Sequence, residues 1–496
     1  MTGKVWFVGA GPGDAGLLTL RGKQVLERAD AVVCDATISP GVRALIPGAA
    51  RVIDAGKRGG RRRMSREAAS RVLLEEALAG NKVVRLEGGD PFLFGSGGEE
   101  AETLSAHGVP FEVVPGVSSA FAVPAYFGIP VTRRDCAAGV HIVAAEKGAI
   151  DYETLARLGG TLVFLSGEAS LAEICAGLLD AGTNPDTPAA VLSEGTTARQ
   201  NGVFAALSEL EAACPNPAAP AIIVVGEVCK LAERLAWYDK RPLAGLRLAV
   251  TRPKGLSGEL AERLRERGAE VLELPALETA PIPDNRALSN ALRDLRDRLY
   301  DWIVFTSPTG VRTFFDAFFE NDDTRILSGV RIAALGPATR EALRKRGLQA
   351  DFMPSAYDGA SLGWELLNIC EEQSRILIPR AAKGNRELIN ALRHGDDLSI
   401  TEVPVYETRR AVSRNIDVKA LPDAAALDYV LFTSESAVRA FAASVRGADF
   451  SKIRAVCAGE KTASRARSYG MRVWTAEEAT LDALADCVEI AAAERQ

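Results

Sequence analysis

Glycines and aspartates near the N-terminus have the types and spacing to do chemistry. Gly9, Gly11 and Gly13 follow an apolar run over residues 5–8, and Asp14 comes directly after them. Glycines let a backbone turn sharply, and the main-chain N–H groups of such a turn can bind a nucleotide-like ligand. The spacing lacks the third glycine of a dinucleotide fingerprint, and Pro12 removes one N–H donor. A tight turn without a ligand is the alternative interpretation.

Two further aspartates follow apolar runs of their own. Asp35 comes after residues 31–34, and Asp90 comes shortly after residues 83–86. Predicted helices alternate with these strands over residues 17–29, 65–80 and 96–108, the last with capping-box spacing at Ser96 and Glu99. Alternating elements predict an α/β domain with a largely parallel sheet, whose ligands bind beyond the carboxyl ends of the strands. We therefore expect Asp14, Asp35 and Asp90 to line one crevice.

The remainder of the chain predicts three more α/β blocks. Apolar runs at residues 141–143, 161–165, 189–192 and 221–225 belong to the first, and an irregular stretch at 237–245 ends it. Beyond that stretch, the segment 301–307 recurs 127 residues later as 428–434. A period of this length indicates two similar lobes rather than a solenoid. We predict domains at 1–240 and 244–496, the second with two α/β lobes.

Each copy of the repeat ends in a hydroxyl pair. Thr306 and Ser307 end the first copy, and Thr433 and Ser434 end the second. Hydroxyl and N–H donors at strand ends can bind an anionic ligand, and the same residues can simply cap the helices that follow.

Composition narrows the class of protein. The chain has 496 residues, of which 47% are hydrophobic and 25% charged, and a net charge of −6. These values are ordinary for a soluble globular protein and argue against nucleic-acid or anionic-membrane partners. No apolar run reaches membrane-spanning length and no signal peptide is evident, so we expect neither a membrane partner nor export. Eight cysteines without a C-x-x-C pair predict buried reduced thiols in a cytoplasmic protein, and three scattered histidines predict no metal site.

Longer motifs resemble two known families. Residues 9–14, 32–40, 56–60, 85–102, 114–120 and 128–135 resemble the uroporphyrinogen-III C-methyltransferase family. The second half, with its FTS repeats and VYET at 405–408, is similar to uroporphyrinogen-III synthase. The resemblance implies a tetrapyrrole-methylase fold, with the cofactor cleft between two α/β subdomains, followed by a two-lobed synthase fold.

The resemblance also implies two reactions. The synthase half would close hydroxymethylbilane to uroporphyrinogen III, with inversion of the last ring and loss of water. The methylase half would transfer two methyl groups from S-adenosylmethionine, without a metal, to give precorrin-2 for the sirohaem and cobalamin branch. Members of the methylase family usually form homodimers, so we expect a homodimer through the first half.

Several residues match functional positions of these families. Asp35 matches a proton acceptor and Lys57 a proton donor; a turn cap and a solvated loop residue are the alternatives. Tyr406 matches a tyrosine that assists loss of the hydroxyl as water, or it is a buried strand tyrosine. Arg252 and Arg380 would meet substrate carboxylates or lie in solvent. The positions that match cofactor contacts are Pro12, Gly88, Gly89, Asp90, Leu93, Ser118, Ser119, Ser166 and Gly195.

The chain departs from the methylase motifs at several positions, of which Ser96 is expected near the substrate and Ser166 on the cofactor side. Ser96 replaces an arginine, Glu87 a lysine, Glu146 the histidine of VTGH and Ser166 a methionine. The substrate carries eight carboxylates, so lost cations should weaken its binding, unless Arg133, Arg134 or residues 61–63 compensate. We expect slower or altered methylation. The alternatives are a methylase-like half that is impaired, acts on another tetrapyrrole or senses S-adenosylmethionine, and a nicotinamide-dependent oxidoreductase in which Asp35 binds ribose.

Overall fold

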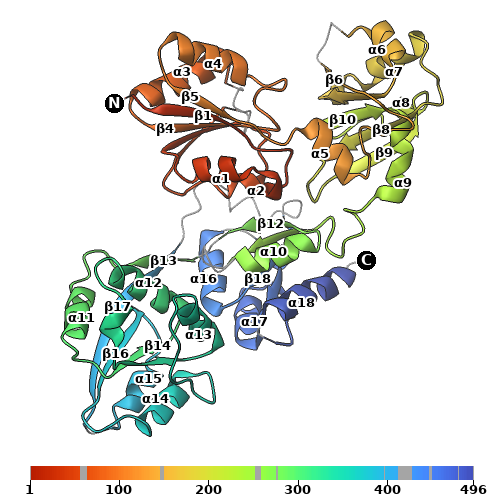
Figure 1. Cartoon of the computed structure of the whole chain (residues 1–496). Coiled ribbons are helices and arrows are strands. Elements are labelled where there is room, and N and C mark those ends of the chain that lie inside the picture. The colour runs from red at the N-terminus through yellow and green to blue at the C-terminus, as the bar shows by residue number, and fades with distance from the viewer. Residues whose placement is uncertain are drawn as a thin grey trace. The chain divides into compact units, whose positions relative to one another are not determined.

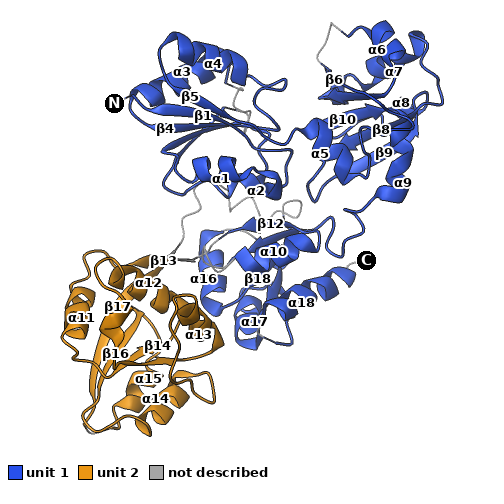
Figure 2. Cartoon of the chain, viewed as in Figure 1, with its two compact units in different colours: residues 1–276, 412–496 blue, residues 277–411 orange. Residues whose placement is uncertain are grey.

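The computed structural model describes residues 2–55, 64–145, 150–251, 258–274, 277–395, 397–410, 427–445, 449–478 and 480–494. Within these residues the chain forms four five-stranded sheets with flanking helices, which is an α/β architecture throughout (Figure 1). The chain divides into two compact units (Figure 2). Unit 1 contains residues 1–276 and 412–496, and unit 2 contains residues 277–411.

The first sheet is entirely parallel, as the sequence predicts. Its strands lie in the order β3 (Arg51–Asp54), β2 (Ala31–Cys34), β4 (Lys82–Glu87), β1 (Lys4–Gly9) and β5 (Phe111–Val114). Its apolar residues form two buried clusters, one that includes Val8 and Val32 and one that includes Phe7 and Val83. The helices of this subdomain are α1 (Leu20–Leu26), α2 (Pro40–Arg43), α3 (Arg66–Leu78) and α4 (Gly97–Ala106).

The helix predicted over residues 17–29 is shorter than expected. Asp14 accepts a hydrogen bond from Gly16 N at 2.7 Å and caps a 3-10 turn, η1 (Ala15–Leu17). Thr19 then caps α1, which begins at Leu20. The polar residues Asp14 and Thr19 thus divide the segment, because each offers a side-chain acceptor to a different set of free N–H groups.

The second sheet is mixed. It has the order β6 (Val140–Ala144), β7 (Thr161–Leu165), β10 (Ala221–Val225), β8 (Pro188–Ser193) and β9 (Asn201–Ala206). Only β6 and β7 pair in parallel, and the other neighbours are antiparallel. The helices of this subdomain are α5 (Ser119–Tyr126), α6 (Tyr152–Leu158), α7 (Leu171–Asp180), α8 (Leu210–Ala213), η3 (Glu227–Leu231) and α9 (Ala232–Leu235), and a 3-10 turn, η2 (Gly167–Ala169), follows β7.

The third sheet completes unit 1 and is parallel. Its order is β12 (Glu270–Glu273), β11 (Arg247–Val250), β18 (Tyr429–Phe432), β19 (Arg454–Cys457) and β20 (Arg472–Thr475). Its helices are α10 (Gly258–Glu266), α16 (Glu435–Ser444), η5 (Phe450–Lys452), α17 (Glu460–Arg467) and α18 (Leu481–Ala493).

Unit 2 holds the fourth sheet. Its order is β13 (Leu277–Pro281), β17 (Ser399–Arg410), β16 (Arg375–Ala381), β14 (Trp302–Phe305) and β15 (Arg331–Ala334), with β13 antiparallel to β17. Its helices are α11 (Arg286–Arg296), α12 (Pro308–Phe318), η4 (Thr324–Leu327), α13 (Pro337–Arg344), α14 (Gly359–Leu367) and α15 (Glu387–Leu392). Phe305, Phe314, Phe315 and Phe318 pack together in its core.

The predicted repeat is confirmed in the two sheets that follow residue 245. The order β12-β11-β18-β19 in one lobe matches β17-β16-β14-β15 in the other. The same polar contact fixes both sheets: Asp428 accepts from Arg247 N at 2.9 Å, and Asp301 accepts from Arg375 N at 2.7 Å. The second half therefore has two lobes of one design.

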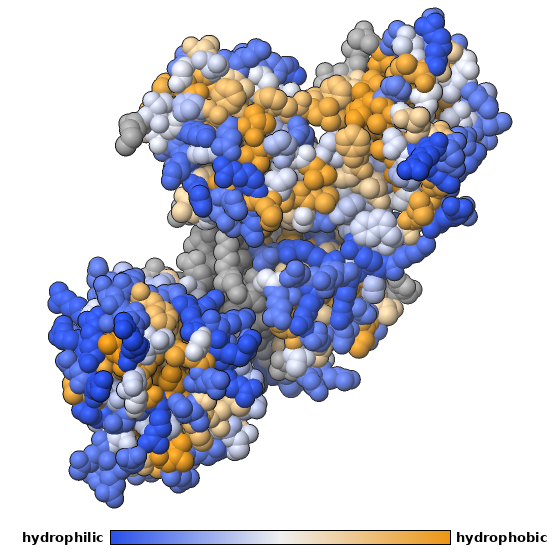
Figure 3. All heavy atoms as spheres, in the orientation of Figure 1, coloured by the Kyte–Doolittle hydropathy of each residue, from blue (hydrophilic) through white to orange (hydrophobic). Residues whose placement is uncertain are grey.

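The exposure of the cysteines corrects one prediction made from composition. All eight cysteines are unpaired, but Cys136 is exposed and Cys214 and Cys370 are partly exposed, so the prediction that every thiol is buried is wrong. Among the described residues no helix has the length and apolarity needed to cross a bilayer, and no cluster of potential metal ligands is found. On the face shown in Figure 3, hydrophobic residues gather in separate groups among hydrophilic ones.

Candidate functional site

The loops that follow β1, β4 and β5 pack against one another with no side chain between them. Gly11 and Gly89 exchange backbone hydrogen bonds of 3.2 and 2.8 Å. A Cβ atom on Gly116 would lie 2.1 Å from the carbonyl oxygen of Gly89. Only glycine fits at this contact, so the loops that follow three strands meet directly through their main chains.

The predicted cofactor residues of the first sheet lie on these loops. Asp90 uses its carboxylate within them, where Phe92 N donates to Oδ1 at 2.8 Å and Gly116 N to Oδ2 at 2.9 Å. Ser118 caps α5 by accepting from Ala120 N at 3.2 Å, and Ser119 is the first residue of that helix. The other predicted positions on these loops are Pro12, Gly88, Gly89 and Leu93.

The second subdomain contributes the loop after β8. Asp14 N donates to the Thr196 hydroxyl at 3.1 Å, and the Tyr126 hydroxyl donates to Asp14 Oδ2 at 2.8 Å. Gly195 precedes Thr196, and a Cβ atom there would lie 2.3 Å from a methyl carbon of Val123 on α5. These contacts bring the Gly195 loop to the glycine-rich loop after β1.

Ser166 is placed differently from the other predicted cofactor residues. It follows β7 with φ 56° and ψ 38°, a left-handed backbone that non-glycine residues seldom adopt. Its hydroxyl does not cap the following 3-10 turn. The structure therefore puts Ser166 at the end of a strand of the second sheet, and the contacts that join the loops of β1 and β8 do not include it.

Asp35 belongs to a largely buried ionic cluster that was not predicted from the sequence. Arg85 on β4 is 4% exposed; its Nη1 lies 2.8 Å from Asp35 Oδ1, and its Nε lies 2.8 Å from Glu100 Oε2. Glu87 is equally buried, and its Oε1 lies 3.9 Å from Arg85 Nε. We call Asp35, Arg85, Glu87, Ser96 and Glu100 the Arg85 cluster.

The capping box predicted at Ser96 is wrong. Its hydroxyl does not cap α4 but donates to Glu100 Oε1 at 2.7 Å and accepts from Arg85 Nη2 at 3.3 Å. Buried carboxylate and guanidinium groups compete for the hydroxyl more strongly than a free helix N–H, because charge-assisted hydrogen bonds are stronger. A signal for the cluster was present: residues 85 and 87 alternate in an otherwise apolar strand, so they face the same side.

Burial changes the protonation of Glu87. Its carboxylate accepts from Ser96 N at 3.2 Å, yet Oε1 is buried and has no hydrogen-bond partner among the described residues. Burial raises the pKa of Glu87 to about 7, although Arg85 opposes the shift and Glu100 and Asp35 add to it. The cluster therefore gains a negative charge near neutral pH.

Lys57 and Arg252 lie outside the described residues, as does Glu146. These residues are the predicted proton donor, one predicted substrate arginine and one departure from the methylase motifs.

In unit 2 the repeat brings two predicted residues together. The Tyr406 hydroxyl lies 3.1 Å from Ser307 Oγ, and the Tyr406 side chain is 9% exposed. Ser307 also caps α12 by accepting from Gly310 N at 3.0 Å. Thr306 precedes it at the end of β14, so one predicted hydroxyl pair adjoins the predicted tyrosine.

The remaining predicted synthase residues have local partners. Arg380 on β16 pairs with Glu402 at 3.0 Å and donates to the Asn385 carbonyl at 2.8 Å, so it does not extend freely into solvent. Ser434 caps α16 by accepting from Ala437 N at 3.2 Å, and Thr433 precedes it. Ser307 and Ser434 therefore both cap the helices that follow them, which is the alternative interpretation of the two hydroxyl pairs.

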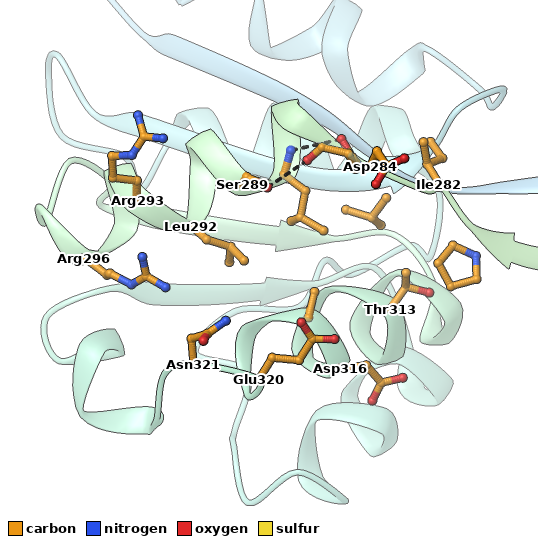
Figure 4. Close-up of a pocket in the computed structure, with 15 residues that line it drawn as sticks. Ile282, Asp284, Ser289, Leu292, Arg293, Arg296, Thr313, Asp316, Glu320 and Asn321 are labelled. Carbon is orange, nitrogen blue, oxygen red and sulfur yellow. Dashed lines mark hydrogen bonds between the residues drawn. The ribbon is translucent and has the colours of Figure 1, made fainter.

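A separate pocket of about 550 Å³ lies in unit 2 beside α11 and α12 (Figure 4). Its charged side chains have both signs, with Arg293 and Arg296 on α11 and Asp316 on α12. Two of them have ion-pair partners already, Arg296 with Asp322 and Asp316 with Arg346. None of the predicted site residues lines this pocket, so it does not support the predicted site.

Comparison with known proteins agrees with the two halves. Residues 4–211 match the family model described as Tetrapyrrole (Corrin/Porphyrin) Methylases, and residues 258–486 match Uroporphyrinogen-III synthase HemD. The porphyrin biosynthesis protein HemD of Ruminiclostridium josui is 41% identical over 98% of this chain and 97% of its own length.

Two further relatives overlap the methylase half. The uroporphyrinogen-III C-methyltransferase of Bacillus subtilis is 37% identical over 70% of this chain and 72% of its own. A siroheme synthase of Neisseria meningitidis is 45% identical over 51% of this chain and 53% of its own.

Fold and family models together define a methyltransferase of the tetrapyrrole-methylase class joined to a synthase domain. The chain belongs to the family of the Ruminiclostridium josui porphyrin biosynthesis protein. It is an enzyme of tetrapyrrole biosynthesis.

Proposed function

We propose that the chain cyclises hydroxymethylbilane to uroporphyrinogen III and methylates that product twice with S-adenosylmethionine to give precorrin-2. The names of the relatives and the fusion of the two matched domains support this pair of reactions. The observation that carries the proposal is the shared edge of the first sheet, where the glycine loops, Asp35 and the Gly195 loop come together. The sirohaem branch is supported by the siroheme synthase relative.

The loops at this edge fit a nucleoside-like methyl donor. Gly89 lies against the main chain at Ser118 and Ser119, and Gly88 faces the Thr37 hydroxyl; glycine at both positions suits close approach of backbone to a flat ligand. S-adenosylmethionine would supply a methyl group activated by its sulfonium. The loops would orient that group in line with a pyrrole carbon of the substrate, and orientation supplies much of the rate.

Asp35 would accept the proton that the pyrrole system loses after methylation. Its side chain is 23% exposed, so it reaches the edge of the sheet, while Arg85 holds one oxygen atom at 2.8 Å. A charge-assisted hydrogen bond from a guanidinium fixes the orientation of a carboxylate. Lys57 remains the proposed proton donor on the resemblance alone.

The synthase half would act by holding a flexible bilane with its two ends together. Closing a long chain is mainly an entropic problem, which positioned donors can solve. Tyr406, inside β17, and Ser307, which caps α12, form a hydroxyl pair, and Tyr406 would assist departure of the bilane hydroxyl as water. Thr306, Thr433, Ser434, Arg252 and Arg380 are proposed as substrate contacts. We also propose a cytoplasmic homodimer, with domains at 1–240 and 244–496.

The test uses the purified full chain. Hydroxymethylbilane is supplied with and without S-adenosylmethionine, and the products are separated by chromatography. We expect uroporphyrinogen III without the methyl donor and precorrin-2 with it. Formation of only the type-I macrocycle, which arises without the enzyme, would overturn the synthase proposal; failure to consume the methyl donor would overturn the methylase proposal.

A second candidate is a methylase half that binds S-adenosylmethionine but methylates slowly. The Arg85 cluster favours it, because three carboxylates face one guanidinium where an anionic substrate must bind. Calorimetric binding of S-adenosylmethionine with turnover below that of the Bacillus subtilis relative would select this candidate.

A further inference from the structure

The Arg85 cluster holds more negative charge than its one guanidinium can balance. With all three carboxylates ionised, Asp35, Glu87 and Glu100 leave a net charge of −2 around Arg85. Isolated charge in a dry interior is costly, and a carboxyl group relieves it by taking up a proton. One member of the cluster should therefore hold a proton over part of the physiological pH range.

Geometry selects Glu87 as that member. Asp35 and Glu100 each lie 2.8 Å from a guanidinium nitrogen, whereas Glu87 is 3.9 Å away. Glu87 is also 96% buried, since its side chain is 4% exposed, and its Oε1 has no hydrogen-bond partner among the described residues. The weakest ion pair in the cluster is the first to accept a proton.

The charged groups nearest Glu87 come from its own strand, the end of β2 and α4. Its own strand supplies Arg85, the end of β2 supplies Asp35, and α4 supplies Glu100, while Gly9 lies opposite on β1 without a side chain. Arg43 on α2 also approaches, but its guanidinium donates to the Asp35 carbonyl at 3.1 Å and pairs with Asp54. The raised pKa of Glu87, about 7, agrees with this arrangement.

The position of Glu87 connects its charge to the proposed substrate. It is the last residue of β4 and directly precedes Gly88 and Gly89, at the edge that carries Asp35. A negative charge here faces a substrate that carries eight carboxylates, according to the proposed function. Like charges separated by about 10 Å at an effective dielectric constant of about 20 repel enough to change affinity by more than about ten-fold, and salt screening reduces this to a several-fold effect.

We propose that Glu87 is a positioning residue that makes tetrapyrrole binding depend on pH. In its neutral form it leaves Arg85 to Asp35 and Glu100 and adds no charge to the edge. In its ionised form it competes for Arg85 and repels the anionic substrate. This inference rests on the proposed methylase function, and it assigns a role to one of the departures from the methylase motifs.

The experiment measures the equilibrium dissociation constant for uroporphyrinogen III, under anaerobic conditions, from about pH 6 to pH 8.5. The carboxylates of the substrate are already ionised throughout this range. We expect the dissociation constant of the full-length protein to rise about three- to ten-fold across it. In Glu87→Gln the constant should be flat and equal to the low-pH value.

Two further variants make the test specific. Glu76→Gln removes a buried glutamate of α3 that pairs with Arg51 and Asn81, away from the cluster, and should retain the pH dependence. Ser96→Arg places a second cation beside Glu87, which should keep it ionised but balanced and so abolish the rise even if Glu87→Gln fails to fold. A flat profile in the unmodified protein, or an unchanged rise in both Glu87→Gln and Ser96→Arg, would overturn the proposal.

Turnover measured in the same samples separates the two claims. Binding that depends on pH without methylation would overturn the proposed function and leave the role of Glu87 standing. Methylation with an affinity that is independent of pH would overturn the role of Glu87 alone.

Discussion

The two candidate sites differ in the charge of the side chains that they bring together. At the edge of the first sheet, which we call the methylase edge, ionic groups form a cluster in which Asp35, Glu87 and Glu100 surround Arg85. The corresponding place in unit 2 pairs neutral hydroxyls, Tyr406 with Ser307, and its nearby guanidinium, Arg380, is already matched by Glu402. The proposed methylation has to remove a proton, which a positioned carboxylate can accept, and the proposed cyclisation has to hold a flexible chain, which positioned hydroxyls can help to orient.

The contrast also predicts different sensitivity to substitution. Removing one partner of a buried ion pair leaves an uncompensated charge and strongly destabilises the folded protein. Removing one neutral hydroxyl costs about one hydrogen bond. Removing a charged partner at the edge of the first sheet should therefore lower the rate of methylation at least ten times more than removing a hydroxyl in unit 2 lowers the rate of cyclisation.

The largest expected effect is that of Asp35→Asn. An amide has the same shape but cannot accept the proton, so methylation should fall about a hundred- to ten-thousand-fold, while cyclisation is unchanged. The measurement is initial rate of methyl transfer at saturating S-adenosylmethionine. Asp30→Asn is the matched control: Asp30 lies at the other end of the same strand and accepts from Lys82 N at 2.8 Å. Equal rates for both variants would remove Asp35 from the chemistry.

Arg85→Met should be next in size. It leaves Asp35 and Glu100 buried without a cation, so unfolding of this subdomain should become easier by about 3–5 kcal/mol. Urea denaturation followed by tryptophan fluorescence measures the change. Arg21→Met is the control, because Arg21 is 52% exposed in its pair with Glu112 and should cost less than about 1 kcal/mol. A loss at Arg85 no larger than at Arg21 would contradict the picture of a buried ionic cluster.

Glu87→Gln should change stability in a direction that depends on pH. Its pKa is raised from 4.5 to about 7 in the folded protein, so the folded state binds the proton more tightly than the unfolded state. The free energy of unfolding should then fall as pH rises from about 4.5 to 7, because the folded carboxylate is forced to ionise. The variant lacks this loss and should be more stable than the unmodified protein by about 1–3 kcal/mol at pH 8, with no gain at pH 4. Denaturation at the two pH values checks the sign, and a less stable variant at pH 8 would refute it.

Tyr406→Phe should have the smallest effect. Losing its bond to Ser307 and its proposed contact with the leaving hydroxyl should lower cyclisation about three- to ten-fold. The measurement is the ratio of type-III to type-I macrocycle from hydroxymethylbilane. Tyr469→Phe, at a partly exposed position, should leave the ratio unchanged. A loss above a thousand-fold would mean that Tyr406 is an acid catalyst and that the contrast between the two sites is false.

The periodicity of the sequence was sufficient to predict the α/β architecture. Alternating apolar runs and turn residues placed the parallel first sheet, and the duplicated segment ending at Ser307 and Ser434 placed two lobes of one design. Local signals also served for α3, where Ser65 caps the first turn and Gly80 follows the last with φ 89°. They failed at Ser96, because charged side chains on β4 and α4, Arg85 and Glu100, bond to its hydroxyl in place of a helix N–H.

The ionic cluster could be predicted only in part. Residues 85 and 87 alternate within an apolar strand, which is enough to put them on one face. Nothing local says that Asp35 and Glu100, 50 residues before and 15 residues after Arg85, meet the same guanidinium. The protonation of Glu87 is even harder to predict from the sequence, because it depends on burial and on the sum of neighbouring charges.

The order of strands in the third sheet has a consequence for synthesis of the chain. β11 pairs with β18, and all of residues 277–411 lie between them in sequence. On the ribosome, β11 and β12 emerge early and must wait, with one edge of β11 unpaired, until the whole intervening lobe has been translated. Unpaired strand edges invite association with other chains. The nascent polypeptide is therefore most vulnerable in the interval before residue 429 leaves the exit tunnel, and slowing translation there should lower its yield.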